Sequence, residues 1–288
     1  MLFLNEAEIV QRKGKGFTAR VHVDQANERL WIIDYTAWDA AALAGELTAL
    51  AGKHGCGKIV FPCVEAEAAV LAEQGFLPEA RVPGFFRGRT AVFLARYLSR
   101  LRATSPRLQD EQRLLDSLAA RARREPPEVR SPLPLRRAGP DDAPALARLF
   151  GTVFMTYPTP VHDPDYLRAA MAHGALFVAA VDGGRLVAAA AAETDLRLGH
   201  AEITDCATLP AHQGRGLGTA LVTRLEEECR RGGCTCLYSL ARAFHPGVNK
   251  VFHRLGYEYG GTLVQNARIG PGGYEDLNVW VKYRPAAG

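Results

Sequence analysis

Residues 201–221, AEITDCATLPAHQGRGLGTAL, constrain the fold more than any other part of the chain. The first part, to about Leu209, is rich in Ile, Thr and Cys and predicts a β-strand, which Pro210 ends because proline has no N–H for a ladder. A glycine-rich segment follows at 213–218, and apolar residues at helical spacing then predict a helix. A strand, a glycine turn and a helix in this order form an arrangement that binds the phosphates of a cofactor.

Gly214, Gly216 and Gly218 have no Cβ, so backbone amides can approach a pyrophosphate closely. The start of the helix adds unpaired N–H groups and the positive end of the helix dipole. Arg215 can add a charged contact. The alternative interpretation is a tight strand–helix turn that binds no ligand.

Two other nucleotide-binding motifs do not match this segment. A Walker loop ends in Gly-Lys-Ser/Thr, which is absent, and the Rossmann pattern G-x-G-x-x-G needs a different glycine spacing. The pattern that fits is Q-x-x-G-x-G, which resembles the acetyl-CoA loop of the GNAT superfamily of N-acyltransferases. That resemblance implies acetyl-CoA as acyl donor and a GNAT fold.

Composition restricts the class of protein and its compartment. A chain of 288 residues predicts two domains, and 48% hydrophobic content is enough for globular cores. The six cysteines contain no C-x-x-C pair, so we predict no metal site and free thiols in a reducing cytosol. The N-terminus resembles neither a signal peptide nor a membrane span, which also favours a cytoplasmic protein.

The element order predicted for residues 135–288 is β-α-α-β-β-β-α-β-α-β-β, which is that of the GNAT fold. The fold class is therefore α/β (α+β), and the resemblance implies a mixed central sheet in which two strands splay apart. The Asp182-Gly183-Gly184 turn predicts a hairpin before the 201–209 strand.

Residues 1–104 predict a smaller α/β domain. Strands are expected at 17–23, 29–34, 58–64 (broken at Pro62) and 91–97, and helices at 40–51 and 65–73. Residues 71–95 resemble the last helix and strand pair of a GNAT domain, although this half has no Q-x-x-G-x-G loop. We interpret it as a degenerate half-copy with a structural or substrate-covering role.

Residues 105–134 are rich in arginine and end in Pro-rich segments, which predicts a solvated, basic linker helix. A nucleic-acid patch is the alternative, but aromatic residues that could stack on bases are missing from this segment, and the net charge of +4 is small. We therefore expect no nucleic-acid partner, no membrane partner and a small-molecule amine as substrate, with a homodimer as the candidate assembly.

The resemblance implies a set of residues that contact acetyl-CoA. Backbone groups of the splayed strand would hold the thioester, and the loop would surround the pyrophosphate. Asn249 stands where the family contacts the CoA chain, and Phe252 stands where many members carry a tyrosine that reprotonates the thiolate. Phenylalanine cannot donate a proton, so water, His253, Tyr238 or Tyr257 would have to replace it. The complete predicted set is Cys206, Ala207, Thr208, Gln213, Gly214, Arg215, Gly216, Leu217, Gly218, Thr219, Asn249 and Phe252.

Two carboxylates in the strand are candidates for the general base that deprotonates the amine. Glu202 lies in A-E-I-T-D-C-A, which resembles the segment that carries the base in lysine-acetylating members of the family. Asp205 is the second candidate. Because side chains alternate along a strand, the two acids face opposite sides unless a bulge intervenes. The alternative for each acid is a salt bridge or a solvent-facing role.

Longer segments resemble one branch of the family, the bacterial and archaeal β-lysine N-acetyltransferases. They are residues 157–167, 239–263 and 272–282, with the N-terminal V-D-x-x-N-x-R-L and G-F-x-x-E-A-x-V-P-G-F-F-x-G. The implied reaction is acetylation of the terminal amine of β-lysine, which yields an osmolyte. The substrate's ammonium groups need acids and its carboxylate needs a cation. The predicted substrate-binding residues are Tyr157, His162, Asp163, Arg242, Glu275 and Asn278, with Asp276 beside them.

Two alternative functions stay open. The acceptor could instead be a diamine, an antibiotic or a protein lysine. A non-catalytic acyl-CoA sensor is the alternative from another class: Phe252 favours it, whereas Glu202 and the intact glycine loop argue against it.

Overall fold

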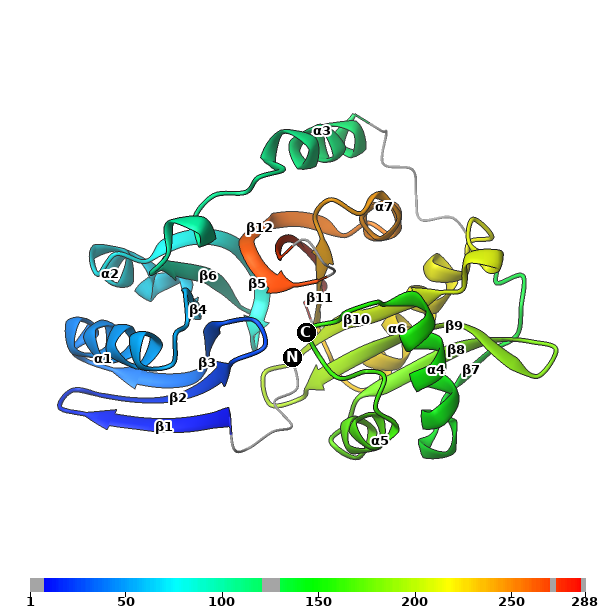
Figure 1. Ribbon diagram of the computed structural model, residues 1–288, viewed down its shortest axis with the longest axis horizontal. Coiled ribbons are helices and arrows are strands. Elements are labelled where there is room, and N and C mark those ends of the chain that lie inside the picture. Colours follow the sequence, from blue (N-terminus) through cyan, green and yellow to red (C-terminus); the bar gives the residue numbers. More distant parts are fainter. Residues whose placement is uncertain (1–7, 121–129, 270–272, 286–288) are drawn as a thin grey trace.

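The computed structural model describes residues 8–120, 130–269 and 273–285. Within these residues, one mixed sheet of 13 strands runs through the whole molecule (Figure 1) in the order β1-β2-β3-β4-β6-β5-β12-β13-β11-β10-β9-β8-β7. The strands are β1 (Ile9–Gly14), β2 (Phe17–Asp24), β3 (Arg29–Ala37), β4 (Lys58–Val64), β5 (Leu77–Phe86), β6 (Arg89–Tyr97), β7 (Leu135–Arg137), β8 (Leu176–Asp182), β9 (Arg185–Asp195), β10 (His200–Thr208), β11 (Cys236–Arg242), β12 (Glu258–Arg268) and β13 (Tyr274–Tyr283). The α-helices are α1 (Ala40–Lys53), α2 (Ala68–Glu73), α3 (Leu108–Ala119), α4 (Ala143–Val153), α5 (Pro164–Ala172), α6 (Leu217–Arg231) and α7 (Pro246–Arg254).

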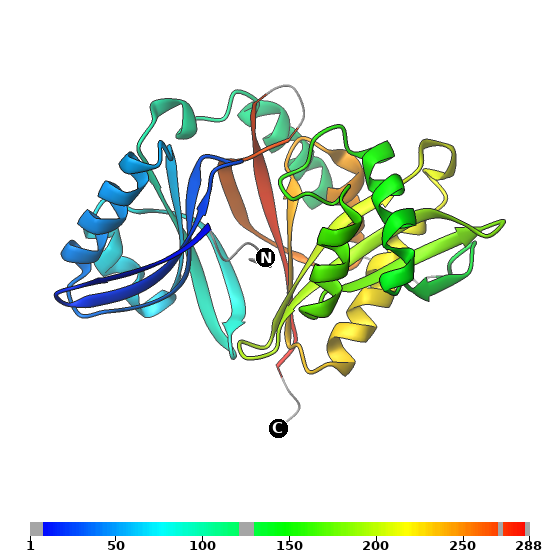
Figure 2. The same cartoon turned by 60° about the horizontal axis from the view of Figure 1, so that its bottom comes forward.

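The two halves of the chain repeat one topology. In each half an antiparallel run of strands leads to a helix, a parallel strand, a second helix and a closing antiparallel pair. The strand order β1-β2-β3-β4-β6-β5 of the first half therefore corresponds, strand for strand, to β8-β9-β10-β11-β13-β12 of the second half. The β5 and β12 strands meet at the centre of the sheet. Figure 2 shows the two halves on either side of this junction.

The β10 and β11 strands separate after a short parallel contact, which is the predicted splay. Their pairing runs from His200–Cys236 to Glu202–Tyr238 and then ends, although both strands continue. A bulge in β10 between Thr204 and Ala207 shifts its register on β9. Asp205 in this bulge has a φ of 51°, a left-handed conformation in which aspartate is enriched among non-glycine residues.

Helices cover both faces of the sheet next to the splay, which explains the run of alanines in β9. Ala188, Ala190 and Ala192 belong to the core cluster beneath α6, whereas Ala189 and Ala191 belong to the cluster beneath α4 and α5. Side chains alternate between faces along a strand, so a strand buried on both sides has an uninterrupted apolar sequence. Figure 2 shows α4 and α5 on one side of these strands and α6 on the other.

Side chains of the N-terminal half bind the backbone of β12 where strand pairing is short. The β5–β12 register holds one residue pair, Gly261 with Ala80. Further along β12, buried polar groups take over the role of a neighbouring strand. These contacts are Lys58 Nζ to Val264 O (2.7 Å), Val264 N to Glu79 Oε1 (2.7 Å), Arg102 Nε to Gln265 O (2.9 Å), Arg29 Nη1 to Asn266 O (2.9 Å) and Arg268 N to Asn27 Oδ1 (2.8 Å).

Three details of the sequence-based prediction need correction. The β4 strand continues through Pro62, which pairs with Phe93 of β6. On its other side β4 pairs with β3 only up to Val60, so no ladder bond is required from the missing N–H. The β1 strand was not predicted. The linker helix α3 is also not fully solvated, because Leu118 is buried and Leu114 and Leu115 pack against the core of the C-terminal half.

Several predictions concern cysteines, metals and membranes. All six cysteines are free, and five of them are buried. No cluster of His, Cys, Asp and Glu among the described residues could hold a metal ion. No helix in the described ranges is long and apolar enough to cross a membrane. The arginines at 121, 123 and 124 and the Pro126-Pro127 pair of the linker lie outside the described residues.

A pair of glycine substitutions tests the packing at the junction of the halves. A Cβ at Gly260 would lie 2.4 Å from the carbonyl oxygen of Arg81, whereas a Cβ at Gly45, in the exposed part of α1, meets nothing within 4 Å. We expect Gly260→Ala to lower the free energy of unfolding by about 2 kcal/mol or more. Gly45→Ala should raise it by roughly 0.5–1 kcal/mol. Urea denaturation of both variants gives the two values, and equal effects would contradict the close approach of β5 and β12.

Candidate active site

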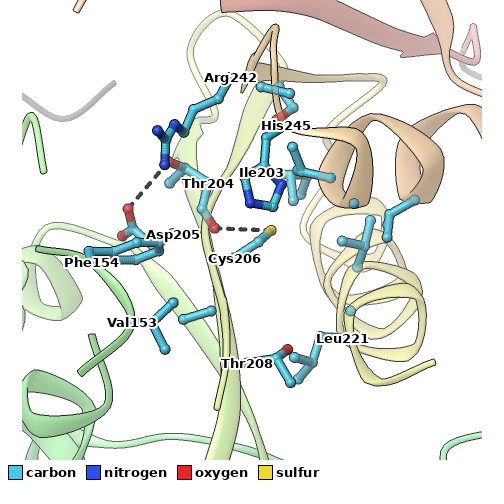
Figure 3. Close-up of a pocket in the computed structure, with 18 of the residues that line it drawn as sticks. Val153, Phe154, Ile203, Thr204, Asp205, Cys206, Thr208, Leu221, Arg242 and His245 are labelled. Atoms are coloured by element: carbon cyan, nitrogen blue, oxygen red, sulfur yellow. Dashed lines mark hydrogen bonds between the residues drawn. The ribbon is translucent and has the colours of Figure 1, made fainter. Parts of the chain in front are cut away.

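A cavity of about 540 Å³ occupies the gap between β10 and β11. Figure 3 shows its middle part, with Phe154 and Asp205 on one side of β10 and Cys206 and Leu221 on the other. One end is lined by the glycine loop and the start of α6, and by Gly247, Val248 and Val251 of α7. The acids of β9 and β10 also line the cavity. On the other side of β11 in the sheet, which we call the far end, the lining residues are Leu277 of β13, Ala267 of β12, Ile269 and Arg29.

The glycine loop leaves the start of α6 open to a ligand. Gly214 and Gly216 have φ values of 75° and 82°, and a Cβ at either position would meet nothing within 4 Å. Gly216 is the N-cap of α6 and offers no side chain, so the first N–H groups of the helix are not capped by the protein. The Gln213 side chain donates to Thr208 O at 3.2 Å and holds the loop against the end of β10. This geometry fits an anionic pyrophosphate.

Most of the residues predicted to contact acetyl-CoA line this cavity. Arg215 is exposed and is not part of the lining. The lining includes Cys206, Ala207, Thr208, Gln213, Gly214, Gly216, Leu217, Gly218 and Thr219. The β10 bulge shifts the register on β9 after Thr204, and β11 has already diverged from β10 at this point. The backbone of Asp205 and Cys206 therefore pairs regularly with neither β9 nor β11. Backbone groups there can hold a thioester carbonyl.

The bulge also brings both candidate bases to one face of β10. Ile203 and Cys206 pack toward α6, whereas Ala207 packs toward α4. Glu202 and Asp205 both line the cavity and are each 6% exposed, and Asp205 interacts electrostatically with Glu202 and with Glu193 of β9. Glu193 is the direct cross-strand partner of Glu202. The sequence analysis expected the two acids to face opposite sides unless a bulge intervened, and β10 contains such a bulge.

These acids differ in their surroundings. Burial raises the pKa of Asp205 to about 7, and the charge of Glu193 adds to this effect. The hydroxyl of Tyr157 interacts with Asp205 and Thr204, and burial raises the pKa of this phenol well above its usual range, so Tyr157 stays protonated and can donate. Glu202 accepts a hydrogen bond from the buried Tyr238 hydroxyl at 3.2 Å. The site therefore presents several carboxyl groups to a cationic amine.

Some predicted site residues lie elsewhere. Asn249 is buried and does not line the cavity. Its Nδ2 donates to the carbonyls of Arg242 (2.9 Å) and His245 (2.8 Å), and its Oδ1 accepts from Asn278 (3.0 Å) and Trp280 (2.8 Å). This amide therefore fixes the β11–α7 connection to β13.

Phe252 belongs to the core cluster beneath α6 and packs edge-on against Tyr257. Tyr238, His253 and Tyr257, named above as proton donors in its place, do not line the cavity either. In the loop before α5, Asp163 caps that helix by accepting from Asp165 N at 2.9 Å, and His162 is exposed. Asp276 is buried and accepts from Gln265 N at 2.8 Å.

Arg242 and Glu275, two predicted substrate contacts, bind each other. Arg242 Nε and Nη2 donate to the two carboxylate oxygens of Glu275, both at 2.7 Å. Arg242 lines the cavity, but this two-pronged contact already uses one edge of its guanidinium.

The cavity residues that the sequence prediction missed include three with ionisable side chains that bear on the chemistry. They are Glu193, His245 and Arg29. His245 follows Arg242 in the loop before α7, and burial together with the charge of Arg242 lowers its pKa. Glu193 could have been found only from the β9–β10 register. Arg29 lies in the V-D-x-x-N-x-R-L segment that was singled out in the sequence, but nothing in the sequence indicated that it reaches the second half.

Comparisons with known proteins decide the family. The Acetyltransferase (GNAT) family matches residues 144–257. N-acetyltransferase YodP of Bacillus subtilis (strain 168) is 35% identical over 270 residues, covering 94% of this chain and 98% of the relative. The chain belongs to the GNAT acetyltransferases.

Two archaeal relatives extend this similarity. The beta-lysine N(6)-acetyltransferase of Methanosarcina mazei is 31% identical and covers 83% of this chain and 96% of its own length. The protein of the same name from Methanococcus maripaludis is 25% identical and covers 91% and 95%. This GNAT protein is thus an acetyltransferase that uses acetyl-CoA, and it resembles these relatives through both halves.

A matched pair of glycines tests the acetyl-CoA loop. Gly216 and Gly233 flank opposite ends of α6, both have positive φ, and a Cβ at either meets nothing within 4 Å. Valine at either position should therefore cost a similar strain of about 1–2 kcal/mol. Only Gly216→Val should also lose the rise in melting temperature that acetyl-CoA produces, because its side chain blocks backbone approach. An undiminished rise in Gly216→Val, measured by differential scanning fluorimetry beside Gly233→Val, would overturn the loop assignment.

The raised pKa of Asp205 predicts a pH-dependent stability. Between about pH 4 and pH 7 the native state holds a proton on Asp205 that the unfolded state has lost, so stability falls as pH rises through this window. Asp205→Asn keeps the left-handed backbone and removes the free-energy cost of ionising a buried carboxyl group. We expect a gain of roughly 1–4 kcal/mol in unfolding free energy at pH 8 and little gain at pH 4.

Asp195→Asn, at the end of β9, is the control for Asp205→Asn. The pKa of Asp195 is lowered by its contacts with Leu198 N, Arg197 and His200, which outweigh its burial. Its loss should therefore destabilise the protein at pH 8 and have little effect at pH values below the native pKa. Urea denaturation across pH measures both, and a stability gain for Asp205→Asn that does not vary with pH would contradict the raised pKa.

Proposed function

We propose that this protein transfers the acetyl group of acetyl-CoA to the terminal amine of β-lysine. The observation that carries the proposal is one continuous cavity that joins the uncapped start of α6 to a wall with three carboxyl groups, those of Glu193, Glu202 and Asp205. A substrate with two ammonium groups favours several buried acids, because one acid serves the reacting amine and the others offset the second charge. The names of the two archaeal relatives support the same acceptor.

In this proposal Glu202 is the general base. It lines the cavity and lies on the strand that splays, so an amine held beside the thioester meets its carboxylate. The Tyr238 hydroxyl donates a hydrogen bond to one oxygen of Glu202, at 3.2 Å, and fixes the orientation of this carboxyl group. A lysine-type ammonium has a pKa near 10.4, so it arrives protonated at neutral pH and needs a base.

Asp205 and Tyr157 would form the acceptor wall. The phenol of Tyr157 interacts with Asp205, and Phe154 stacks on Tyr157 at 4.3 Å between ring centroids, which fixes the ring. An ammonium group placed near Asp205 would hold this carboxyl in its charged form. Acetyl-CoA supplies the activated acyl group, while the backbone at Cys206, Ala207 and Thr208 orients it.

The leaving thiolate is proposed to take its proton from water. Phe252 has no acidic hydrogen and lies in the core, and the alternative donors Tyr238, His253 and Tyr257 do not line the cavity. His245 does line it, but its lowered pKa makes it neutral at physiological pH and therefore a weak acid. The donor position of many family members is thus replaced by solvent.

One assay separates the proposed acceptor from its alternatives. Release of free thiol from acetyl-CoA is followed with β-lysine, lysine and spermidine in parallel. Turnover with β-lysine well above the other two supports the proposal, and a preference for another amine replaces the acceptor. A protein that binds acetyl-CoA and releases no thiol with any amine would be the sensor instead. A cytoplasmic location, which the free thiols support, and a homodimer stay predictions.

The general-base role predicts a rate loss that depends on pH. Glu202→Gln keeps the shape and the contact with Tyr238 but removes basicity, so turnover at neutral pH should fall by roughly 10²–10⁴-fold. The melting-temperature rise with acetyl-CoA should stay normal. The loss should shrink at high pH, where more amine arrives neutral, and steady-state kinetics from pH 7 to pH 10 measures this recovery.

Asp205→Asn is the comparison for Glu202→Gln. If Asp205→Asn loses turnover in this pH-dependent way and Glu202→Gln does not, Asp205 is the base. If neither variant loses turnover, the amine is deprotonated in solution and the protein acts by positioning alone.

A further inference from the structure

The segment V-D-x-x-N-x-R-L at residues 23–30 builds a fixed network around Arg29. The carboxylate of Asp24 accepts from Arg29 Nε at 2.8 Å and from Asn27 Nδ2 at 2.9 and 2.8 Å. Asn27 in turn accepts from Arg268 N of β12 through its Oδ1 at 2.8 Å. The guanidinium also lies over the ring of Trp31, 5.2 Å from its centroid. Two other residues of this sequence pattern, Asp24 and Asn27, therefore hold Arg29 in a single orientation.

This arginine crosses from the N-terminal half to the cavity. Arg29 Nη1 donates to Asn266 O of β12 at 2.9 Å, and Arg29 lines the cavity together with Ala267 and Ile269 beyond that carbonyl. Its side chain is 2% exposed. Among the described residues, Arg29 Nη2 has no hydrogen-bond partner. It is absent from the set of fully enclosed side-chain atoms without a partner, so this atom is not completely covered by protein. Arg29 therefore lines the cavity and has N–H groups that these contacts do not use.

Arg242 is less suited to bind an anion than Arg29. The Nε/Nη2 edge of Arg242 is filled by both oxygens of Glu275, so an anion at that edge would meet a carboxylate. Arg29 instead meets Asp24 through Nε alone, and Asn27 also binds both oxygens of that carboxylate. Lys58 and Arg102 also lie close enough to interact electrostatically with Arg29, although Lys58 is itself paired with Glu79 at 2.8 Å.

The two ends of the acceptor region thus differ in charge. Carboxyl groups of β9 and β10 line the cavity on one side of β11, whereas Arg29 is bound to β12, which β11 and β13 separate from β10 in the sheet. The apolar residues Ala267, Ile269 and Leu277 line the cavity as well. An extended molecule with the reacting ammonium group at one end, a methylene chain, and a carboxylate at the other end matches this order of charges.

We propose that Arg29 binds the carboxylate of the acceptor and makes the enzyme specific for amines that carry one. This proposal rests on the acceptor reaction proposed above and adds a substrate contact from the N-terminal half. It also accounts for the V-D-x-x-N-x-R-L segment, in which Asp24 and Asn27 act as positioning residues. An acceptor without the carboxylate would leave buried N–H groups of Arg29 unpaired. We therefore expect a low kcat/KM for such an acceptor.

The experiment compares matched acceptors on one enzyme preparation. Values of kcat/KM are measured for β-lysine and its carboxamide, and for lysine and its carboxamide. Wild-type enzyme should prefer the carboxylate of its acceptor pair, and Arg29→Gln should reduce this preference by roughly 10- to 100-fold, the worth of hydrogen bonds to a charged group. The KM for acetyl-CoA should change little. The ratio of the two kcat/KM values, for the carboxylate and its carboxamide, does not depend on the fraction of folded enzyme in the preparation. A destabilised variant can therefore still be tested.

Arg242→Gln and Arg29→Lys are the controls. Arg242→Gln should keep the wild-type preference, because Glu275 already occupies that guanidinium. Arg29→Lys keeps the charge opposite Asp24 and should fold even where Arg29→Gln does not. One ammonium cannot serve Asp24, Asn266 O and a carboxylate with the geometry of a guanidinium, so the preference should fall here as well.

The outcomes separate this inference from the proposed function. Equal use of a carboxylate and its carboxamide by wild-type enzyme overturns the inference, even if β-lysine is acetylated. An unchanged preference in both Arg29 variants, or its loss in Arg242→Gln alone, overturns it too. If lysine is acetylated and β-lysine is not, the proposed acceptor fails, and a preference that depends on Arg29 within the lysine pair still supports the carboxylate site.

Discussion

Buried side chains of the N-terminal half hold the β12 backbone, and the rest of the structure depends on this junction. Where the β5–β12 pairing ends, Lys58, Glu79 and Arg102 supply the donors and acceptors that a neighbouring strand would supply. Burial lowers the pKa of Lys58 to about 8, and the nearby Glu79 carboxylate offsets only part of that cost. A single sheet can therefore run through both halves without a regular central ladder. The same contacts fix where β12 lies, and β12 supplies the far wall of the cavity.

The cavity itself follows from two departures from regular pairing. The β10 and β11 strands share a short parallel contact and then separate, and the bulge at Asp205 turns β10 while it stays paired with β9. Without the bulge, Glu202 and Asp205 would point to opposite faces. With it, both acids line one cavity beside the uncapped start of α6. The left-handed backbone of Asp205 costs energy, and this cost lies at the point where the acids are brought together.

Local sequence patterns predicted the elements and the loop, but not what depends on register or on contacts between the halves. Gly216 and its neighbours specify a cofactor loop because their chemistry is local. The bulge that unites Glu202 with Asp205 has no local signal, and Glu193 enters the site only through the β9–β10 register. Arg242 was predicted to bind the substrate carboxylate, because nothing in the sequence showed that Glu275 lies opposite it. Likewise, the apolar side of α3 could not be assigned to a partner without the fold.

The N-terminal half has the topology of the C-terminal half but has no Q-x-x-G-x-G loop between β3 and α1. Its β3 and β4 strands also separate after a short parallel contact, from Arg29–Lys58 to Trp31–Val60. The connection to α1 has no glycine loop, however, and the Asp39 carboxylate caps that helix by accepting from Ala42 N at 2.9 Å. A carboxylate at this position satisfies the helix N-terminus and repels a pyrophosphate. The first residue of the parallel contact is Arg29, which reaches across β12 instead. The N-terminal half thus contributes a side chain to the cavity of the C-terminal half.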